Sequence, residues 1–501
     1  MSEQDILKLM AQYAPIKIKM TDQAYSQLFG DIFRSELRYN ATAKGWFFYD
    51  GKRWREDVEG LMAANTARKF AEILNVYADA IRGKYIGEQK EGETPEEKEK
   101  REQREKKWND FQRFTSSFYD ARERETLVKD ARAVMRVLQE EFDQNINLFN
   151  CQNCTLDLST MEQHPHTAAD MLTKISGCEL QPDADCAKWE KFIDEVMQGD
   201  KDKAAYLRRM CGYSLTAVPT LEKAFILYGS TTRNGKSTFV ESFRAMMGDY
   251  AGVMQPESLA AVKGKNGSNA SPDIAGLAGI RFLSVPEPPK NMLLNVALVK
   301  ALTGGDAIKA RKLYENMFEF RPQFKIFMHC NALPVVTDET LFDSERVRII
   351  EFERHFTERE QNQNLKAELQ KPEVLSSILT WALKGLKDFQ KNGERPPKCV
   401  KAATENYRQR FDKIAMFFCE VMEQEQGKNT AGVDVYQAYM KWCSADSRGY
   451  GTEGKQKFFK ALRDHGLLQE KATVNGNTVR NVIVGYTISA EWEEEEKPPF
   501  P

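Results

Sequence analysis

The chain has 501 residues, a formal net charge of −2, and 41% hydrophobic and 29% charged residues. This length exceeds what a single hydrophobic core supports, so we expect about two to four domains of a soluble globular protein. The near-neutral charge argues against a generally DNA-attracting surface, so any contact with nucleic acid has to come from local basic segments or from oligomerisation.

The sequence lacks the signals of a membrane or secreted protein. No apolar run reaches the roughly 20 residues needed to cross a bilayer, and the first residues lack the charged-then-apolar pattern of a signal peptide. The nine cysteines are an odd number scattered along the chain. This usage predicts reduced thiols and a cytoplasmic location.

Residues 1–200 are expected to form a mixed α/β or mostly helical N-terminal region. The aromatic-rich run 46–54 predicts a β-hairpin, with Asp50 and Gly51 as its two-residue turn. The segment 87–107 is almost wholly polar and dense in Glu and Lys, which favours a solvated helix or flexible insertion over a binding site. A second short strand pair is expected within 146–158.

Cys151 and Cys154 form a C-x-x-C pair, and His164 and His166 follow downstream. Four such ligands in this order can make a zinc site. The alternative, which we favour, is a metal-free strand pair whose cysteines are packed like the other buried thiols of the chain.

A phosphate-binding loop is predicted at 224–239. The apolar run 224–228 indicates a buried strand, and the sequence from Gly235 opens a predicted helix whose free N–H groups would face a polyphosphate. Lys236 would reach the β- and γ-phosphates of ATP, and the Ser237 hydroxyl would contact Mg²⁺. The candidate nucleotide-binding residues are Gly229, Asn234, Gly235, Lys236, Ser237 and Thr238.

The loop departs from G-x-x-x-x-G-K-[ST] by one residue, counted from Gly229 to Gly235. Either Ser230 replaces the first glycine, or the loop bulges. A surface turn with an exposed lysine is the alternative without function.

Residues 220–355 alternate predicted strands with helical segments, as α/β domains do. Hydrolysis of a triphosphate needs a carboxylate that orients water, a polar sensor and a cation. Glu287 and Asn331 each follow a predicted strand and supply the first two. Arg346 and Arg348 begin the last strand and are candidates for the cation. The expected strands are 224–228, 281–285, 324–330 and 347–352.

Each of these candidates has a simpler reading. Glu287 is then a lone surface glutamate, and Asn331 a turn residue that ends a strand before Pro334. The two arginines are then partners in surface ion pairs.

A final domain is expected over 412–490, after a basic linker at 396–411. Helices around 415–425, 433–443 and 455–465, followed by a hairpin 472–474 and 479–488 that turns at Asn475–Gly476, suggest a winged helix. Lys457 and Lys460 on the last helix then contact duplex DNA, unless this domain mediates protein contacts. The tail 491–501 is acidic and reads as a solvated segment or a docking peptide for a replication protein.

Five segments occur in an order that resembles motifs A, B, B′, C and the arginine finger of superfamily III helicases. They are 228–238, 284–288, 299–306, 324–334 and 344–356, and 148–158 and 194–213 resemble the region that precedes the helicase core. The nearest resemblance is to the primase-helicases of phages, plasmids and mobile elements. Five motifs in order are far more specific than any one of them.

The resemblance implies an α/β, AAA+-like P-loop ATPase core over 201–395, with 1–200 as a collar or loading region. It implies a homo-oligomeric ring, usually a hexamer, with ATP between subunits and Arg346 supplied by the neighbour. It also implies 3′-to-5′ movement on single-stranded DNA in a bacterial host cytoplasm. Motif B′ leads into a DNA-gripping hairpin at 306–314, where Lys309, Arg311 and Lys312 would contact phosphates. A basic helix surface is the alternative for that segment.

The predicted function is an ATP- and Mg²⁺-dependent replicative DNA helicase of a phage or mobile element. The alternative is an ATP-regulated origin-binding initiator without robust unwinding, which would bind duplex origin DNA. A DNA-packaging motor is less favoured, because no acidic nuclease-like cluster follows the ATPase.

Overall fold

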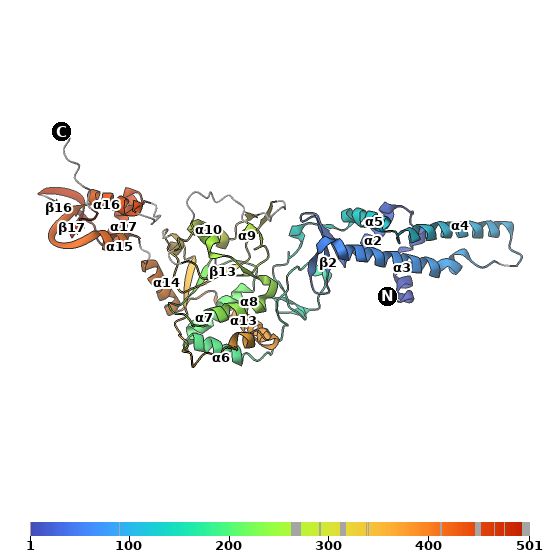
Figure 1. Ribbon diagram of the computed structural model, residues 1–501, viewed down its shortest axis with the longest axis horizontal. Coiled ribbons are helices and arrows are strands. Elements are labelled where there is room, and N and C mark those ends of the chain that lie inside the picture. The colour runs from blue at the N-terminus through green and yellow to red at the C-terminus, as the bar shows by residue number, and fades with distance from the viewer. Residues whose placement is uncertain are drawn as a thin grey trace, which may run out of the picture.

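A computed structural model describes residues 2–89, 91–261, 272–289, 292–310, 317–336, 338, 340–410, 413–445, 452–464, 466–474 and 476–492. An elongated helical N-terminal part, a central part built on a sheet, and a small C-terminal part lie in a row (Figure 1). None of the helices within the described residues is both long and apolar enough to span a bilayer.

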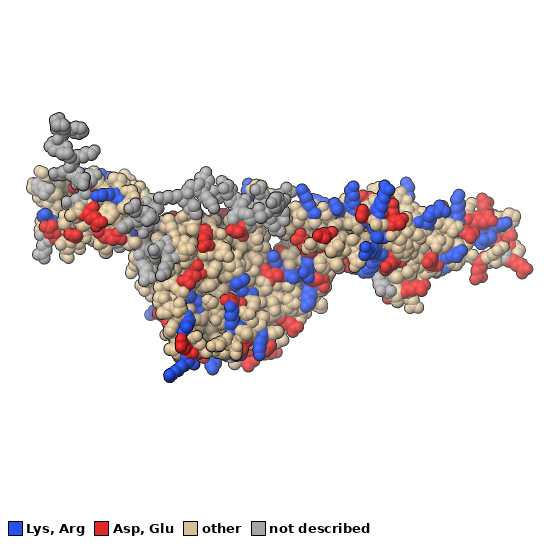
Figure 2. Space-filling model, in the orientation of Figure 1, with Lys and Arg blue, Asp and Glu red and all other residues tan. Residues whose placement is uncertain are grey.

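The N-terminal part packs helices on a small sheet with strand order β3-β2-β1-β4. Its apolar core includes Phe29, Phe70 and Trp108, and acidic and basic side chains alternate along its surface (Figure 2). The helices are α1 (Glu3–Tyr13), α2 (Asp22–Phe33), α3 (Leu61–Ile86), α4 (Pro95–Ser117) and α5 (Ala121–Val134). The strands are β1 (Leu37–Asn40), β2 (Gly45–Tyr49), β3 (Trp54–Asp57) and β4 (Arg136–Val137).

The charged segment 87–107 becomes a helix only from Pro95. Thr94 and Glu97 form a capping box and Pro95 occupies the first turn, a combination that satisfies free amides and fixes the start of a helix. The exposed, charged first half of α4 matches the solvated helix that we expected. Its second half buries Trp108, whose indole N–H donates to the Ala78 carbonyl at 2.8 Å.

The first hairpin is present, but its turn is longer than predicted. Tyr49 pairs with Trp54, so residues 50–53 connect the strands. The prediction of a two-residue turn at Asp50–Gly51 is therefore wrong. The Asp50 carboxylate accepts the amides of Lys52 and Arg53, each at 2.9 Å. An aspartate that caps its own loop in this way stabilises a wider connection.

A second strand unit follows, with β5 (Leu148–Asn150), β6 (Thr155–Asp157) and β7 (Gln163–His164) in that order. The expected strand pair within 146–158 is therefore confirmed. Its side chains, Phe149 among them, belong to the same apolar cluster as the central sheet. The Asn150 amide donates to the Tyr250 hydroxyl at 3.0 Å, so this unit is fastened to the central part.

The central sheet has the order β14-β8-β13-β10-β9 and is parallel throughout. Its strands are β8 (Ala224–Tyr228), β9 (Ala251–Val253), β10 (Phe282–Val285), β13 (Lys325–Cys330) and β14 (Val347–Glu351). The four strands that we expected are confirmed to within a residue at their ends. β9 was not anticipated, because it is short and its sequence, Ala-Gly-Val, carries little strand signal.

Helices cover both faces of this sheet. Phe225 and Leu227 of β8 join a cluster with α6, α7, α8 and α13. Ala224 and Ile226 join the opposite cluster, with α10 and α14. The bounds are α6 (Ala187–Val196), α7 (Lys201–Ser214), α8 (Lys236–Met247), α9 (Pro272–Ala275), α10 (Val296–Thr303), α11 (Thr340–Asp343), α12 (Leu365–Leu369), α13 (Pro372–Asn392) and α14 (Lys398–Arg410).

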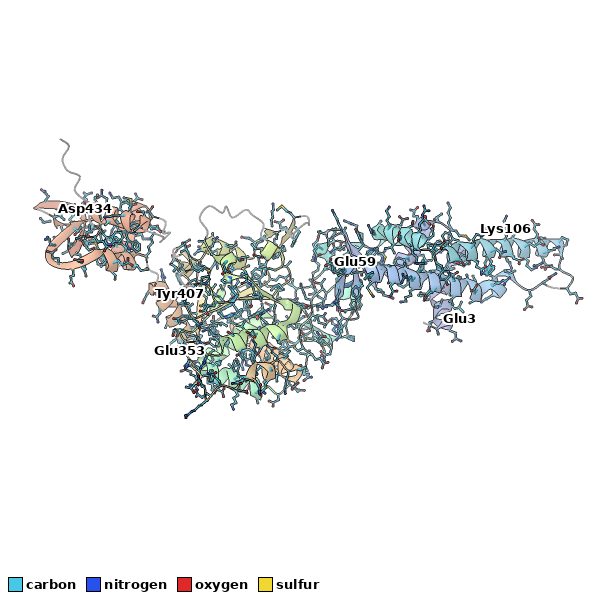
Figure 3. The ribbon with its side chains drawn as sticks, viewed as in Figure 1. Glu3, Glu59, Lys106, Glu353, Tyr407 and Asp434 are labelled. Atoms are coloured by element: carbon cyan, nitrogen blue, oxygen red, sulfur yellow. The ribbon has the colours of Figure 1, made fainter. Side chains whose placement is uncertain are left out.

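α14 coincides with the segment expected as a basic linker, and it packs on β14. Tyr407 of α14, labelled in Figure 3, is buried, and its hydroxyl donates to the Pro334 carbonyl at 2.8 Å. This helix is therefore part of the packed central unit.

The C-terminal part contains α15 (Lys413–Val421), α16 (Gly432–Ser444) and α17 (Lys455–Asp464). They pack on a sheet of order β15-β17-β16, formed by β15 (Met422–Ala431), β16 (Gln469–Val474) and β17 (Asn477–Ile488). The helix predicted to reach residue 425 ends at Val421, because the chain continues as a strand along β17. Tertiary pairing here overrides local helix propensity.

Candidate functional site

The loop between β8 and α8 is shaped by two glycines. A Cβ at Gly229 would lie 2.4 Å from the Phe352 carbonyl oxygen and 3.0 Å from Lys236 Nζ. Gly235 has a φ of +84°, and a Cβ there would lie 2.5 Å from Val196. Both positions therefore require glycine. The close contacts fall on Gly229, whereas Ser230 is exposed, which favours the bulged loop over the replacement of Gly229 by Ser230.

Three predicted residues meet at the carboxyl ends of three neighbouring parallel strands. Lys236 Nζ lies 2.7 Å from Asn331 Oδ1 and 3.0 Å from the Gly229 carbonyl. The Asn331 side-chain amide donates to Glu287 at 2.8 Å, and its backbone amide donates to the same carboxylate at 3.2 Å. Lys236, Asn331 and Glu287 thus form one hydrogen-bonded row, which we call the lysine–glutamate row.

Burial sets the charge states around this row. It lowers the pKa of Lys236, while the neighbouring Cys330 and Glu287 act in the opposite direction. Burial raises the pKa of Cys330 to about 12. It lowers the pKa of His329, and the Lys236 ammonium adds to that effect. The Cys330 thiol and the His329 imidazole are therefore neutral near pH 7.

The remaining loop residues have different surroundings. Asn234 is buried and holds the loop together, because its side-chain amide donates to the Thr231 carbonyl at 2.5 Å. Ser237 is exposed at the first turn of α8, and Thr238 is half-buried beside it.

Across the described ranges, no three His, Cys, Asp or Glu side chains are grouped so as to hold a metal ion. Cys151 and Cys154 are buried free thiols.

The segment after β14 holds the loop from the other side, and sequence reasoning missed it. The Phe352 amide donates to the Tyr228 carbonyl at 2.6 Å, and the Phe356 amide to the Arg233 carbonyl at 2.9 Å. His355 Nδ1 lies 2.9 Å from the Thr232 carbonyl. These contacts are mostly backbone hydrogen bonds, which leave no motif in the sequence.

Arg346 lies at the opposite end of the sheet from the loop. Its carbonyl accepts the Ala224 amide at 2.8 Å, at the start of β8, whereas the loop follows the end of that strand. A strand of five residues at about 3.3 Å per residue separates them by about 16 Å. The guanidinium is 2.7 Å from Glu222 and 3.1 Å from Thr303 Oγ1. Arg346 therefore does not reach Lys236 of its own subunit.

Arg348 is buried and neutralised within the core. Its guanidinium lies 2.7 Å from Glu394 and 2.6 Å from Glu345, and it is 9% exposed. In the sheet, Arg348 of β14 pairs with Phe225, the second residue of β8. These contacts are those of a structural ion pair, so the geometry does not support the catalytic role that we predicted for Arg348.

The DNA-binding candidates are only partly described. Lys309 is exposed on β11 (Ile308–Ala310), opposite Glu319 of the antiparallel β12 (Phe318–Phe320). Arg311 and Lys312 lie outside the described residues. On α17, Lys457 is 2.8 Å from Glu453, and Lys460 is exposed.

Known proteins show similarity to this chain over different parts of its length. Residues 26–198 match the family described as "D5 N terminal like". A "Putative helicase L207/L206" of Acanthamoeba polyphaga mimivirus is 27% identical over 327 residues, 61% of this chain and 34% of that protein. The chain is therefore similar to this family over its N-terminal part, and its relatives carry helicase names. The expected resemblance to primase-helicases is thereby confirmed.

A further relative is also viral. "Putative helicase 022R" of Frog virus 3 is 28% identical over 321 residues, 60% of this chain and 32% of that protein. The chain thus spans about a third of the length of these curated relatives. Among solved structures, the apo structure of the NrS-1 C terminal region matches 90% of this chain and 96% of its own chain. The identity is 9% and the TM-score is 0.49.

Proposed function

We propose that this chain is the ATP-hydrolysing part of a DNA helicase of superfamily III, with an AAA+-like P-loop core. The observation that carries the proposal is the lysine–glutamate row. A loop lysine at a helix N-terminus, an amide and a carboxylate stand together at the edge where parallel sheets bind ligands. The helicase names of the relatives support the same class.

The row supplies the groups that phosphoryl transfer to water requires. Lys236 binds the β- and γ-phosphates through its ammonium and exchanges its contact with Asn331 for them. Asn331 is then free to hydrogen-bond the γ-phosphate or the attacking water. Glu287 orients that water and accepts its proton. The phosphate groups would lie over the loop amides that Gly229 and Gly235 keep accessible.

The donor chemistry of the loop fits Mg²⁺ bound together with the nucleotide. The Ser237 hydroxyl is an oxygen ligand at the exposed first turn of α8, and Mg²⁺ prefers oxygen ligands and keeps several waters. When bound, the ion neutralises charge on the phosphates.

Arg346 completes the site of a neighbouring subunit in a ring. Because its own loop lies at the far end of the sheet, Arg346 is free to serve another protomer, provided that it releases Glu222. The β11–β12 hairpin carries Lys309 and would face single-stranded DNA in the channel of a hexameric ring. The described part of the C-terminal unit, with three helices and a β-hairpin, supports the winged-helix proposal.

One observation favours the second candidate, an ATP-regulated origin-binding initiator. α17 exposes Lys455, Lys460 and Arg463 on one helix, a pattern suited to duplex phosphates.

The test is ATP hydrolysis with and without single-stranded DNA, together with strand displacement. The helicase proposal predicts DNA-stimulated hydrolysis and unwinding, both lost in Lys236→Ala. ATP-dependent assembly on duplex DNA without unwinding would favour the initiator. Hydrolysis that persists in Lys236→Ala would contradict both.

A further inference from the structure

A cationic cavity lies in the N-terminal part, far along the chain from Lys236 and Glu287. It has a volume of about 230 Å³ and lies between the end of α2, β1 and the start of β4. Arg34, Arg38 and Arg136 line it, together with Glu141 and the apolar side chains of Met135 and Met171. We call it the arginine cavity. The three arginines come from the end of α2, from β1 and from β4, and the parallel pairing of β1 with β4 brings the last two side by side.

Two of the three guanidinium groups are held in place by backbone carbonyls. Arg34 donates to the Val134 carbonyl at 3.1 Å. Arg38 donates to the Arg34 carbonyl and lies 5.6 Å from the Trp54 ring centroid. A guanidinium carries five N–H donors, so these contacts fix the orientation and leave further donors for a ligand.

The protein supplies one carboxylate against the three arginines of the cavity. Elsewhere in the chain, Arg209 pairs with Asp388 at 2.8 Å and Arg348 with Glu394 at 2.7 Å. Among the described residues, no ion pair to Arg34, Arg38 or Arg136 is formed. The one carboxylate at the cavity, Glu141, already accepts the Leu138 amide at 2.7 Å. Burial, and then the neighbouring Arg34, lower the pKa of Arg38 to about 10 despite Glu141.

We propose that the arginine cavity binds a phosphate group. Planar forks of N–H donors match phosphate oxygens in pairs, and three of them around one hollow are suited to a single anion. The volume is below the roughly 300–1,000 Å³ of clefts that enclose drug-sized ligands, so the cavity takes a phosphate and not a whole nucleoside triphosphate. The phosphate belongs either to the backbone of single-stranded DNA or to a free phosphate compound. This site does not depend on the ATP site.

The first experiment measures binding of a fluorescent oligothymidylate to the full chain by anisotropy, over a range of salt concentrations. Arg34→Gln and Arg136→Gln are the test variants, because both side chains are exposed and their loss leaves the core intact. Arg104→Gln, on the exposed face of α4, removes the same charge away from the cavity. A DNA phosphate in the cavity predicts that each test variant lowers the slope of log K against log salt by about 0.7, as one lost single-strand phosphate contact does.

The second experiment distinguishes the other source of phosphate. Calorimetric titration with inorganic pyrophosphate is done in a Lys236→Ala background, which removes the lysine of the ATP site. If the cavity serves a free phosphate compound, the oligothymidylate slope stays unchanged while Arg34→Gln and Arg136→Gln lose pyrophosphate affinity relative to Arg104→Gln. Test variants that match Arg104→Gln in both experiments would overturn the proposal.

Discussion

The Lys236 ammonium lies 2.7 Å from the side-chain oxygen of Asn331, although Lys236 begins α8 and Asn331 follows β13. The parallel pairing of β8 with β13 puts their carboxyl ends side by side. Asn331 in turn donates to Glu287 at 2.8 Å. The Asn331 amide therefore links the phosphate-binding loop to the Glu287 carboxylate.

Replacing Asn331 by Ala should slow ATP hydrolysis by about 10²- to 10³-fold, the usual cost of losing one preorganised donor at a transition state. ATP affinity should change little, since Lys236 and the loop amides remain. Steady-state kinetics separate kcat from KM. Asn364→Ala, an exposed asparagine on the approach to α12, should behave like wild type. An equal loss in both variants would remove Asn331 from the site.

Arg346 should act in trans. Alone, Arg346→Ala and Lys236→Ala should each be nearly inactive, because an arginine finger contributes about 10³- to 10⁵-fold to hydrolysis. Mixed in one oligomer, the two variants should regain part of the activity, since an intact loop then meets an intact Arg346 at some subunit boundaries. Mixtures that stay inactive, although co-assembly is shown by cross-linking, would argue for a role within one subunit.

Arg348→Ala should destabilise the fold and not the chemistry. Removing one partner of a buried ion pair costs about 3–5 kcal/mol, and Arg348 and Glu394 are only 9% and 12% exposed. Urea unfolding measures the loss. Lys100→Ala breaks the exposed pair with Glu96 and should cost less than about 0.5 kcal/mol. Equal losses would show that the Arg348 pair is not buried in solution.

How much of this site was predictable depends on whether a residue carries a local signal. Lys236, Glu287 and Asn331 follow apolar runs that end in polar residues, so sequence alone placed them at strand ends. The distinction between Arg346 and Arg348 depends on strand register and on Glu394, a residue distant in sequence. Two other features depend on long-range pairing, which no local pattern reports. One is the set of backbone contacts from residues 352–356 to the loop, and the other is the formation of the strand β15.

ATP binding should weaken at high pH earlier than an ordinary lysine would allow. Burial lowers the pKa of Lys236 from 10.5, so its ammonium is lost as pH rises through that lower value. Between the folded and unfolded pKa values the unfolded chain binds more protons, so this group's contribution to stability rises with pH while phosphate binding falls. Nucleotide affinity against pH tests this. Lys236→Arg, whose guanidinium stays charged, should lack this step.

The carboxylate gives the most direct test of the ATP hydrolysis site. Glu287→Gln keeps the shape of the side chain but removes the base, so ATP turnover should fall by about 10²- to 10⁴-fold. Binding of a fluorescent ADP analogue, measured on the same preparation, should stay close to wild type. Turnover near the wild-type rate in Glu287→Gln would contradict the account, because the lysine–glutamate row would then have no catalytic carboxylate.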